Sequence, residues 1–426
     1  MEMTRHGTKM TGVGLLLAGL TLLAAVLPTA VFASHVANAA SPASKSTINV
    51  EQINLQSIPG VWDDSGGLQA YFNYVNAHGG VAGHKINVTE CYAGSLISSS
   101  PNQATTCAQQ AVSNHVMALV GSFNDYDTNI LPIVAPSHIA DFGNFPASQV
   151  DSTSSDSYPL LVPGVIFDAG LGAMLVQQGH CKTVGVLATS GTATEVQAVN
   201  ATNAGTKWAG GKVVPAVLVS ATATDFAPAV ATIESEGGTC IADETAGTAS
   251  VAVVTAASQS GQTLKIAGIG PTFSPATIAA LGPLANGLYI DQTAQELAQV
   301  TDGGGHTAQE KQFYNLMQQY EPSDIPLGNS EWPCYESAAA FVIVAKYMAA
   351  NHISFTPSNF EKAIPKVNLA TGFFAPVDFA SKGPVPGYPR IHAVSLNYLI
   401  VQNDQIVPIS HRNINVAAAL IKYPNG

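Results

Sequence analysis

Polar residues follow five of the β-strands that the sequence predicts, each at the point where a strand ends. Such side chains offer hydrogen-bond donors and acceptors, and ligands of open parallel sheets bind beyond the carboxyl ends of the strands. The loop residues are Asn124, Asp125, Tyr126, Gly143, Asn144, Phe145, Ser190, Thr192, Glu244, Thr245 and Thr272. The sequence therefore predicts a shared cleft that binds a small molecule through hydrogen bonds.

The sequence lacks the motifs of the common hydrolase, metalloprotease and nucleotide-binding classes. It contains no GxSxG, HExxH, CxxC or Walker sequence, and its 11 histidines never pair at metal-ligand spacing. The glycines at residues 303–305 have no strand before them and no Lys-Ser/Thr after them, so we predict a loop there. We therefore expect a binding protein that is not an enzyme and that uses no metal and no cofactor.

The composition argues against nucleic acid as a partner. Charged residues make up 10% and hydrophobic residues 46% of the 426 residues, and the formal net charge is −12. Nucleic acid demands a basic face, which 16 basic residues against 28 acidic ones do not provide. The length suits two domains, and beyond the N-terminus no apolar run is long enough to cross a bilayer.

Residues 1–39 have the pattern of a signal peptide. Arg5 and Lys9 precede an apolar core at residues 13–27, and small residues follow at Ala37 and Ala39. Cleavage after Ala39 predicts an extracytoplasmic protein, periplasmic or at the cell surface, and an uncleaved anchor is the alternative. No cysteine lies in or just after this segment, so we expect no lipid anchor.

Strands and helices alternate along the chain and must position the polar loops. Leu68, Phe72 and Val75 form one face of a helix, and two glycines at residues 79–80 end it before the next strand. Strand and helix alternate over residues 48–156, and after a crossing linker at residues 151–157 the alternation resumes over residues 168–268. We predict an α/β protein with two doubly wound parallel-sheet domains.

Several pieces of this chain occur in the order of one known family. They are the helix end at residues 76–83, the strand end at residues 119–121, the segment at residues 184–188 that opens a second domain, the Gly-Pro turn at residues 268–271 and a tail at residues 398–408. The chain thereby resembles, over roughly residues 48–409, the extracytoplasmic solute-binding proteins of ABC importers. The resemblance is to the branched-chain amino-acid binding type, which has the type I periplasmic binding fold.

The resemblance implies two lobes that are joined by a multi-strand hinge, with the ligand cleft between them. The N-terminal lobe would comprise residues 48–160 and 292–373, and the C-terminal lobe residues 161–291 and 374–426. The protein would be a monomer that captures a small polar or amphipathic ligand, amino-acid-like, an amide or a carboxylate, for an ABC permease in the membrane. The alternative is a ligand-binding sensor module for a membrane receptor.

The resemblance also assigns roles to single residues. Asn124 and Asp125 match the loop that holds a ligand carboxylate, and residues 143–145 match the loop that completes it. Trp62 lies close to the aromatic wall of the first loop, and Tyr335 matches an aromatic residue at a helix start on the cleft. Ordinary core packing is the alternative for both aromatic residues.

One position departs from the family pattern. Amino-acid receptors of this type place an acidic side chain after the Gly-Pro turn, where it pairs with the ligand's ammonium group, and this chain has Thr272 there. A buried ammonium without an anion is costly. Either Glu244 or Asp125 therefore supplies the anion, or the ligand is not an α-amino acid.

The five cysteines are candidates for disulfides in an exported protein. Cys91 ends a strand, and Cys107 lies on the apolar face of the next helix. Cys181 and Cys240 both lie at strand starts that can be neighbours in a doubly wound sheet. We predict the pairs Cys91–Cys107 and Cys181–Cys240 with Cys334 left over, and simple buried thiols are the alternative.

Overall fold

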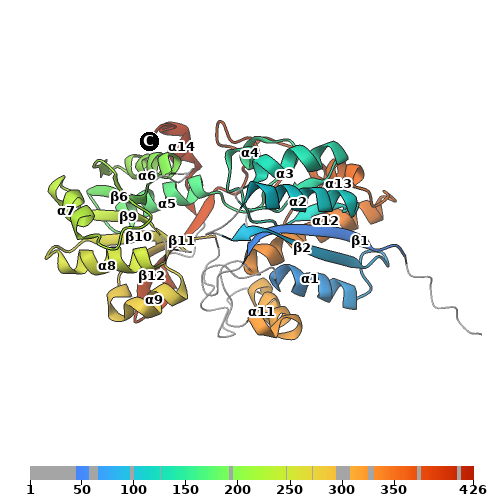
Figure 1. Cartoon of the computed structure of the whole chain (residues 1–426), viewed down its shortest axis with the longest axis horizontal. Helices are drawn as coiled ribbons and strands as arrows, with labels where there is room; N and C mark the ends of the chain where they lie inside the picture. Colours follow the sequence, from blue (N-terminus) through green and yellow to red (C-terminus); the bar gives the residue numbers. More distant parts are fainter. Residues whose placement is uncertain are drawn as a thin grey trace, which may run out of the picture. The chain divides into compact units, whose positions relative to one another are not determined.

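Figure 1 shows the fold of the chain, which is a computed structural model. The structure describes residues 45–56, 66–95, 100–124, 126–190, 195–245, 247–270, 272–293, 308–324, 331–371, 376–409 and 414–426. Within these ranges no helix is both long enough and apolar enough to cross a membrane. The signal peptide predicted at residues 1–39 lies outside the described residues and stays a prediction.

The first sheet has parallel strands in the order β2-β1-β3-β4-β5. These strands are β1 (Ile48–Gln56), β2 (Ile86–Ser95), β3 (Ala118–Val120), β4 (Ala140–Phe142) and β5 (Ser157–Tyr158). The helices between them are α1 (Gly66–Ala77), α2 (Pro101–Ser113), α3 (Asp127–Val134) with the 3-10 turn η1 (Ala135–Ser137), and α4 (Gln149–Thr153).

The crossing linker predicted at residues 151–157 is wrong in part, since this segment holds the end of α4 and the start of β5. Asp151 accepts hydrogen bonds from the backbone N–H (2.8 Å) and the hydroxyl (2.9 Å) of Ser148. This capping arrangement lets a short helix form in a Ser- and Asp-rich stretch.

The second sheet has the order β13-β12-β11-β10-β9-β6-β7, with β8 beside β6 and β14 beside β12. The strands that pair in parallel are β6 (Thr183–Thr189), β7 (Lys212–Val213), β8 (Val217–Val219), β9 (Cys240–Glu244), β10 (Lys265–Ile269) and β11 (Tyr289–Gln292). The strands β12 (Ser395–Gln402), β13 (Gln405–Pro408) and β14 (Ile414–Asn415) pair antiparallel. The helices of this region are α5 (Gly164–Gln177), α6 (Glu195–Trp208), α7 (Ala227–Ser235), α8 (Thr248–Gln259), α9 (Pro275–Leu281) with the turn η2 (Gly282–Ala285), and α14 (Ala417–Lys422).

These two sheets confirm the prediction of an α/β protein with parallel, doubly wound sheets. Within the alternation over residues 168–268 the sequence predicts one strand at residues 213–219, and the structure divides this segment into β7 and β8. Pro215 lies between the two strands and has no N–H to donate to the sheet, which explains the interruption.

The chain passes between the two sheet regions three times. After β11 it forms α11 (Ala308–Tyr320), η3 (Pro322–Asp324), α12 (Glu331–Ala350), α13 (Pro357–Ala363) and η4 (Ile364–Lys366). Phe341 of α12 contacts Phe72 of α1, with ring centroids 5.6 Å apart, in the core of the first sheet. Phe379 still belongs to this core whereas Val385 belongs to that of the second sheet, so the third crossing follows the predicted boundary at residues 373–374 by a few residues.

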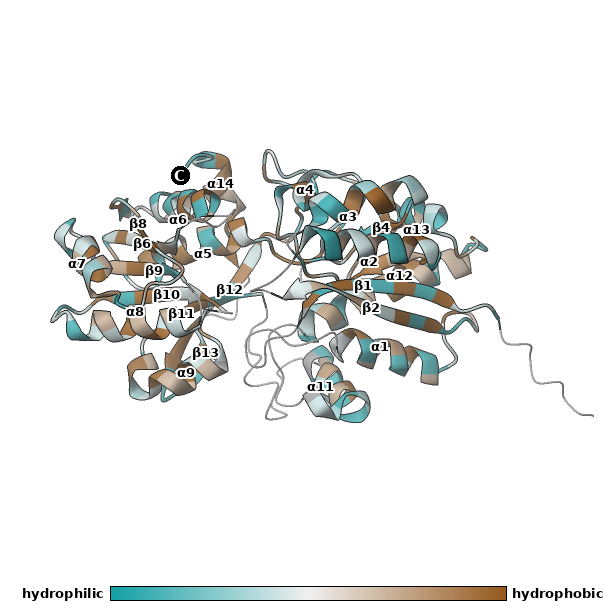
Figure 2. Cartoon of the chain, in the orientation of Figure 1, coloured by the Kyte–Doolittle hydropathy of each residue, from teal (hydrophilic) through white to brown (hydrophobic). Residues whose placement is uncertain are grey.

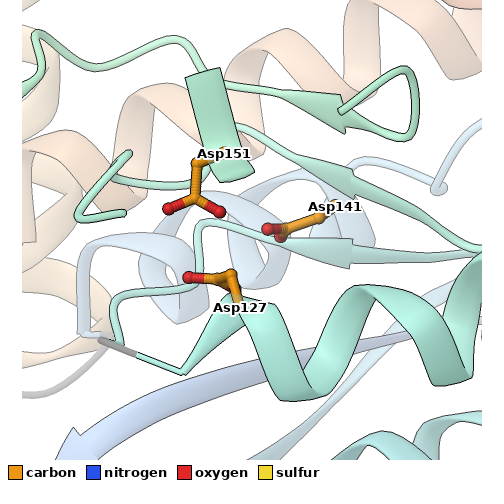
Figure 3. Close-up of side chains that lie close together, drawn as sticks. All are labelled: Asp127, Asp141 and Asp151. Atoms are coloured by element: carbon orange, nitrogen blue, oxygen red, sulfur yellow. The ribbon is translucent and has the colours of Figure 1, made fainter. Parts of the chain in front are cut away.

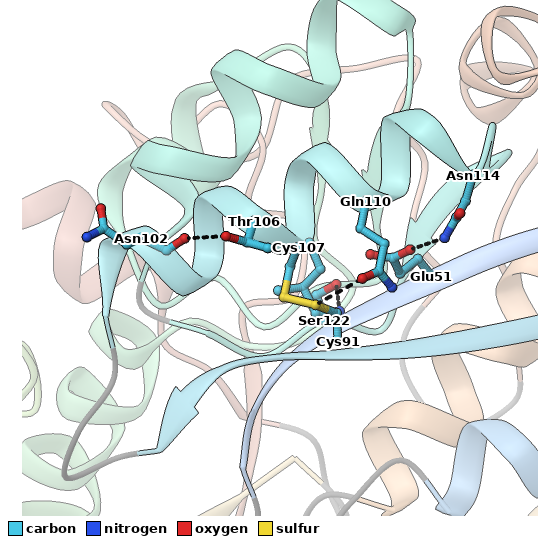
Figure 4. Close-up of a disulfide and its surroundings, with 9 residues drawn as sticks. Glu51, Cys91, Asn102, Thr106, Cys107, Gln110, Asn114 and Ser122 are labelled. Atoms are coloured by element: carbon cyan, nitrogen blue, oxygen red, sulfur yellow. Dashed lines mark hydrogen bonds between the residues drawn. A yellow bond between two sulfur atoms is a disulfide. The ribbon is translucent and has the colours of Figure 1, made fainter.

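Each sheet region contains one disulfide, and both have the predicted pairing. Cys91 bonds to Cys107 of α2 (Figure 4), and Cys181 bonds to Cys240 at the start of β9. The prediction that Cys91 ends its strand is wrong, because β2 continues to Ser95. Cys334 is buried in α12 and forms no disulfide. The disulfides tie a helix to a strand in the first region and two neighbouring strand starts in the second.

Hydrophilic and hydrophobic residues mix along β1, as Figure 2 shows, although this strand lies inside the first sheet. Glu51 is fully buried, and its Oε2 accepts a hydrogen bond from Asn114 Nδ2 at 3.5 Å (Figure 4). Burial raises the pKa of Glu51 from 4.5 to about 7. The first sheet therefore carries a carboxyl group that titrates near neutral pH.

Candidate functional site

A cavity of about 430 Å³ lies at the carboxyl ends of β6, β9 and β10. Ala188 and Thr189 end β6, Glu244 ends β9 and Ile269 ends β10, and all four line the cavity. The segment after β4 (residues 145–148), Ser152 of α4, and the N-terminal parts of α5 and α6 also line it. Its volume falls in the range of about 300–1,000 Å³ that small-molecule sites occupy.

Four residues that the sequence predicts for ligand binding line this cavity. They are Phe145, Glu244, Thr245 and Thr272. The structure thus brings the loops after β4, β9 and β10 to one place, and their contact with a ligand stays a prediction.

Asn124 and Asn144, two predicted ligand-binding residues, do not line this cavity and instead form hydrogen bonds that stabilise their loops. Asn124 is buried, its Nδ2 donates to Asp127 Oδ1 at 3.2 Å, and its Oδ1 accepts from the Tyr126 N–H at 2.7 Å. Asn144 is buried too, and its Nδ2 donates to Ser157 Oγ at 3.3 Å.

Gly143 has φ +72°, and a Cβ there would lie 2.6 Å from the Cβ of Ser337 in α12. The Ser337 hydroxyl donates to the Gly143 carbonyl at 2.7 Å. This glycine therefore lets the loop after β4 approach α12, which is a structural role.

Two further predicted residues lie apart from the cavity lining. Tyr335 is buried, and its ring contacts those of Tyr71 and Phe313 at centroid distances of 4.9 and 5.0 Å. Core packing, the alternative that the sequence left open, describes this position. Ser190 is exposed, and its N–H donates to the Val219 carbonyl at 2.7 Å.

The remaining predicted residues, Trp62, Asp125 and Thr192, lie outside the described residues. Their roles stay predictions.

Acidic side chains make up the charged part of the lining. Asp168 of α5, Glu195 of α6 and Glu244 line the cavity, and none of its described lining residues is basic. Asp168 is only 7% exposed, and within the described part of the chain its carboxylate accepts no hydrogen bond. The cavity therefore has an excess of hydrogen-bond acceptors and negative charge.

This excess of negative charge raises the pKa values of the buried carboxyl groups at the cavity. Burial, followed by the charges of Glu244 and Asp291, raises the pKa of Asp168 well above its usual value. Burial also raises the pKa of Glu244 from 4.5 to about 7, although the Thr202 hydroxyl donates to it at 3.0 Å. Asp291 is fully buried, and its pKa is raised well above the usual value for the same reason. A positively charged group in the cavity would relieve this repulsion.

The threonines of the site are already engaged in hydrogen bonds. The Thr245 hydroxyl donates to Asp243 Oδ1 at 2.7 Å, and the Thr272 hydroxyl donates to the Thr245 carbonyl at 3.1 Å. Thr272 thus links the loops after β9 and β10. Whether Glu244 supplies the anion that the Gly-Pro turn lacks stays a prediction.

Sequence reasoning missed Asp168, Glu195, Ser148 and Ser152, which also line the cavity. One signal for Asp168 is present in the sequence, because it is the only charged residue of the otherwise apolar helix α5. Acidic residues are almost never fully buried unless they are paired. A single aspartate in an apolar helix is therefore a sign of a functional position.

The sequence profile of the periplasmic binding protein family matches residues 63–387. With the two sheets and the cavity at the strand ends, the chain belongs to the periplasmic binding protein family. This membership implies an extracytoplasmic location and the binding of small molecules. A search of curated protein sequences finds no match.

Solved structures of similar fold bind different ligands. A leucine-binding protein from Thermotoga maritima is 15% identical, with a TM-score of 0.66 over 87% of this chain and 99% of that one. A fatty acid ABC transporter substrate-binding protein from Thermomonospora curvata is 15% identical, with a TM-score of 0.69 over 88% and 94%. A solute-binding protein from R. palustris in complex with 4-hydroxybenzoate is 18% identical, with a TM-score of 0.67 over 87% and 97%. At these identities the similarity establishes the fold, while the ligand must be argued from the site.

Proposed function

We propose that this protein is the solute-binding receptor of an ABC importer and that it captures a small molecule carrying a cationic or strongly hydrogen-bond-donating group. The observation that carries the proposal is the carboxylate of Asp168, which lines the cavity almost fully buried and accepts no hydrogen bond within the described residues. A ligand group with N–H donors would satisfy it and would offset the repulsion from Glu244.

The rest of the cavity favours a ligand with an apolar portion. Phe145, Val165 and Ile269 contribute apolar surface beside the carboxylates. Of the ligand classes that the sequence leaves open, amides and amino-acid-like molecules fit this lining, and amines, which the sequence does not suggest, fit it as well. A ligand that offers only a carboxylate fits worst, because like charges repel in a site of low dielectric constant.

A ligand screen followed by one matched pair of variants tests this proposal. Thermal-shift screening should compare amines, amides, amino acids and aliphatic and aromatic acids, and calorimetry should give Kd for each hit. Asp168→Asn should weaken binding of a cationic hit at least about tenfold, because a hydrogen bond to a charged group contributes about 1.5–3 kcal/mol. Asp225→Asn, the same change at an exposed position, should leave Kd unaltered.

Two outcomes would contradict the ligand assignment. One is tight binding of a simple carboxylate, and the other is an equal effect of the two variants on a cationic hit. Delivery to an ABC permease is tested separately, by ligand uptake in cells that carry the permease with and without this receptor. Ligand binding without any effect on uptake would favour the sensor module instead.

A further inference from the structure

Three aspartates from three separate segments of the first sheet region converge on one another (Figure 3). Asp127 begins α3, Asp141 lies within β4, and Asp151 belongs to α4. All three are buried, with exposed fractions of 1%, 0% and 0%. Each offers a carboxylate oxygen, and these oxygens all lie within 4.8 Å of one another.

The charges that act on Asp127 and Asp141 are those of other aspartates. The charges that act on Asp127 are those of Asp151 and Asp141, and the charge that acts on Asp141 is that of Asp151. Burial and these like charges raise the pKa of both carboxyls well above the usual value. Folding therefore brings together negative charges that need protons or a cation.

The hydrogen bonds of the three carboxylates differ. Asp127 accepts from Asn124 and Asp151 accepts from Ser148, but neither oxygen of Asp141 accepts a hydrogen bond within the described structure. Figure 3 shows the carboxylate of Asp141 directed toward the other two. A fully buried carboxylate without any donor is costly, and this one points into the space that the other two border.

We propose that Asp127, Asp141 and Asp151 bind a hard divalent cation and that Ca²⁺ is the ion that fits. Carboxylate oxygens are the preferred ligands of such ions. One carboxylate oxygen of each aspartate lies within 4.8 Å of the others, so a single cation between them has three ligands close at hand. Ca²⁺ accepts a flexible arrangement of oxygen ligands, whereas Mg²⁺ demands a near-ideal octahedron and keeps several of its waters, which a buried cluster does not favour.

The cation would fix the loop that borders the ligand cavity. Phe145 and Ser148 line that cavity and lie between Asp141 and Asp151 in the sequence, while none of the three aspartates lines it. The cation site is thus distinct from the ligand site and anchors both ends of one of its walls. Sequence motifs do not reveal it, because its ligands come from three segments with no fixed spacing.

Calcium titration of the metal-stripped protein tests this proposal. Thermal unfolding and calorimetry should be recorded in EDTA and then in excess CaCl₂, with NaCl of equal ionic strength as the control. The melting temperature should rise by about 3 °C or more at 100 times Kd. Asp141→Asn should abolish the rise and the calorimetric heat, whereas Asp156→Asn, a nearby charge outside the cluster, should keep both.

Asparagine has nearly the shape of aspartate but carries no charge, so Asp141→Asn removes a buried charge without changing the packing. In EDTA the melting temperature of this variant should therefore be no lower than that of the wild type. A lost calcium response in this folded variant then reports the site and not misfolding. Absence of any calcium-dependent rise in the wild type, or an equal rise in Asp141→Asn, would overturn the proposal. A wild type stabilised by acid but not by calcium would show that protons occupy the cluster instead.

Discussion

Both sheet regions bury carboxylates, but they differ in what can reach these groups. In the first region Asp127, Asp141 and Asp151 face one another, and none of them lines the ligand cavity. In the second region Asp168 and Glu244 line a cavity of about 430 Å³. The comparison teaches that the size of the access decides which partner neutralises the charge. We therefore propose an organic cation for the second cluster and a bare ion for the first, with protons as the competing partner.

Changing the pH probes both regions and should have the largest effect. Glu51 in the first region and Glu244 in the second each have a pKa raised from 4.5 to about 7 in the folded protein. The folded state therefore binds more protons than the unfolded state between these values. The stabilisation is complete below about pH 4.5 and is lost as the pH rises through about 7.

In EDTA and without ligand, these two glutamates together should contribute about 3 to 6 kcal/mol to the excess of the free energy of unfolding at pH 5 over that at pH 8, since one pKa unit corresponds to about 1.4 kcal/mol. The buried aspartates with raised pKa values add to this excess in the same direction. Urea unfolding at the two pH values measures this difference. Glu51→Gln and Glu244→Gln should each reduce it by a similar amount. A variant that leaves it unchanged would show that its region does not hold the protonated carboxyl.

Much of the fold follows from local sequence, and the disulfides follow from the fold. The sequence predicts a helix at residues 248–259, because apolar residues recur there just after a glycine, and α8 has these bounds. Cys91 and Cys107 could be paired because the order of strand and helix fixes which residues meet. Such features depend on periodicity and on nearest neighbours, which a single sequence displays.

The site was predictable only where it lies on loops after strands. Glu244 and Thr272 were found in this way, whereas Asp168 lies in a helix that is buried on nearly all sides. Periodicity cannot tell which side of such a helix borders a cavity. For Tyr335 the sequence suggests a cleft position, whereas the structure packs its ring against Tyr71 and Phe313. These contacts come from other helices and are visible only in the tertiary structure.

Removing each disulfide in turn compares the two regions, and we expect the next largest changes in the free energy of unfolding. The bond Cys181–Cys240 spans 59 residues and Cys91–Cys107 spans 16. Loop-closure entropy predicts losses of about 4 and about 3 kcal/mol in the double Cys→Ser variants. Urea unfolding of both variants at one pH gives the two losses, and a larger loss in the first region would contradict the entropic account.

Two glycine variants should have the smallest effects. Gly143 (φ +72°) and Gly247 (φ +59°) both have backbone conformations that disfavour other residues, but a Cβ at Gly247 meets nothing within 4 Å. Gly247→Ala should cost about 1 to 2 kcal/mol for the backbone alone. Gly143→Ala should cost about 1 kcal/mol more, because the new methyl group meets Ser337. Equal losses in thermal unfolding would mean that α12 moves aside without cost.

The place of α12 in the core of the first sheet affects the order in which the protein can fold. Strands β1 to β5 leave the ribosome first, yet the ring contact between Phe72 and Phe341 can form only after α12 has been synthesised. The second sheet is likewise incomplete until β12, near the end of the chain, has been synthesised. Neither region can complete its core on a nascent chain, because the contacts that close it are distant in sequence. Both cores are therefore completed only after α12 and β12 have been synthesised, late in the production of the chain.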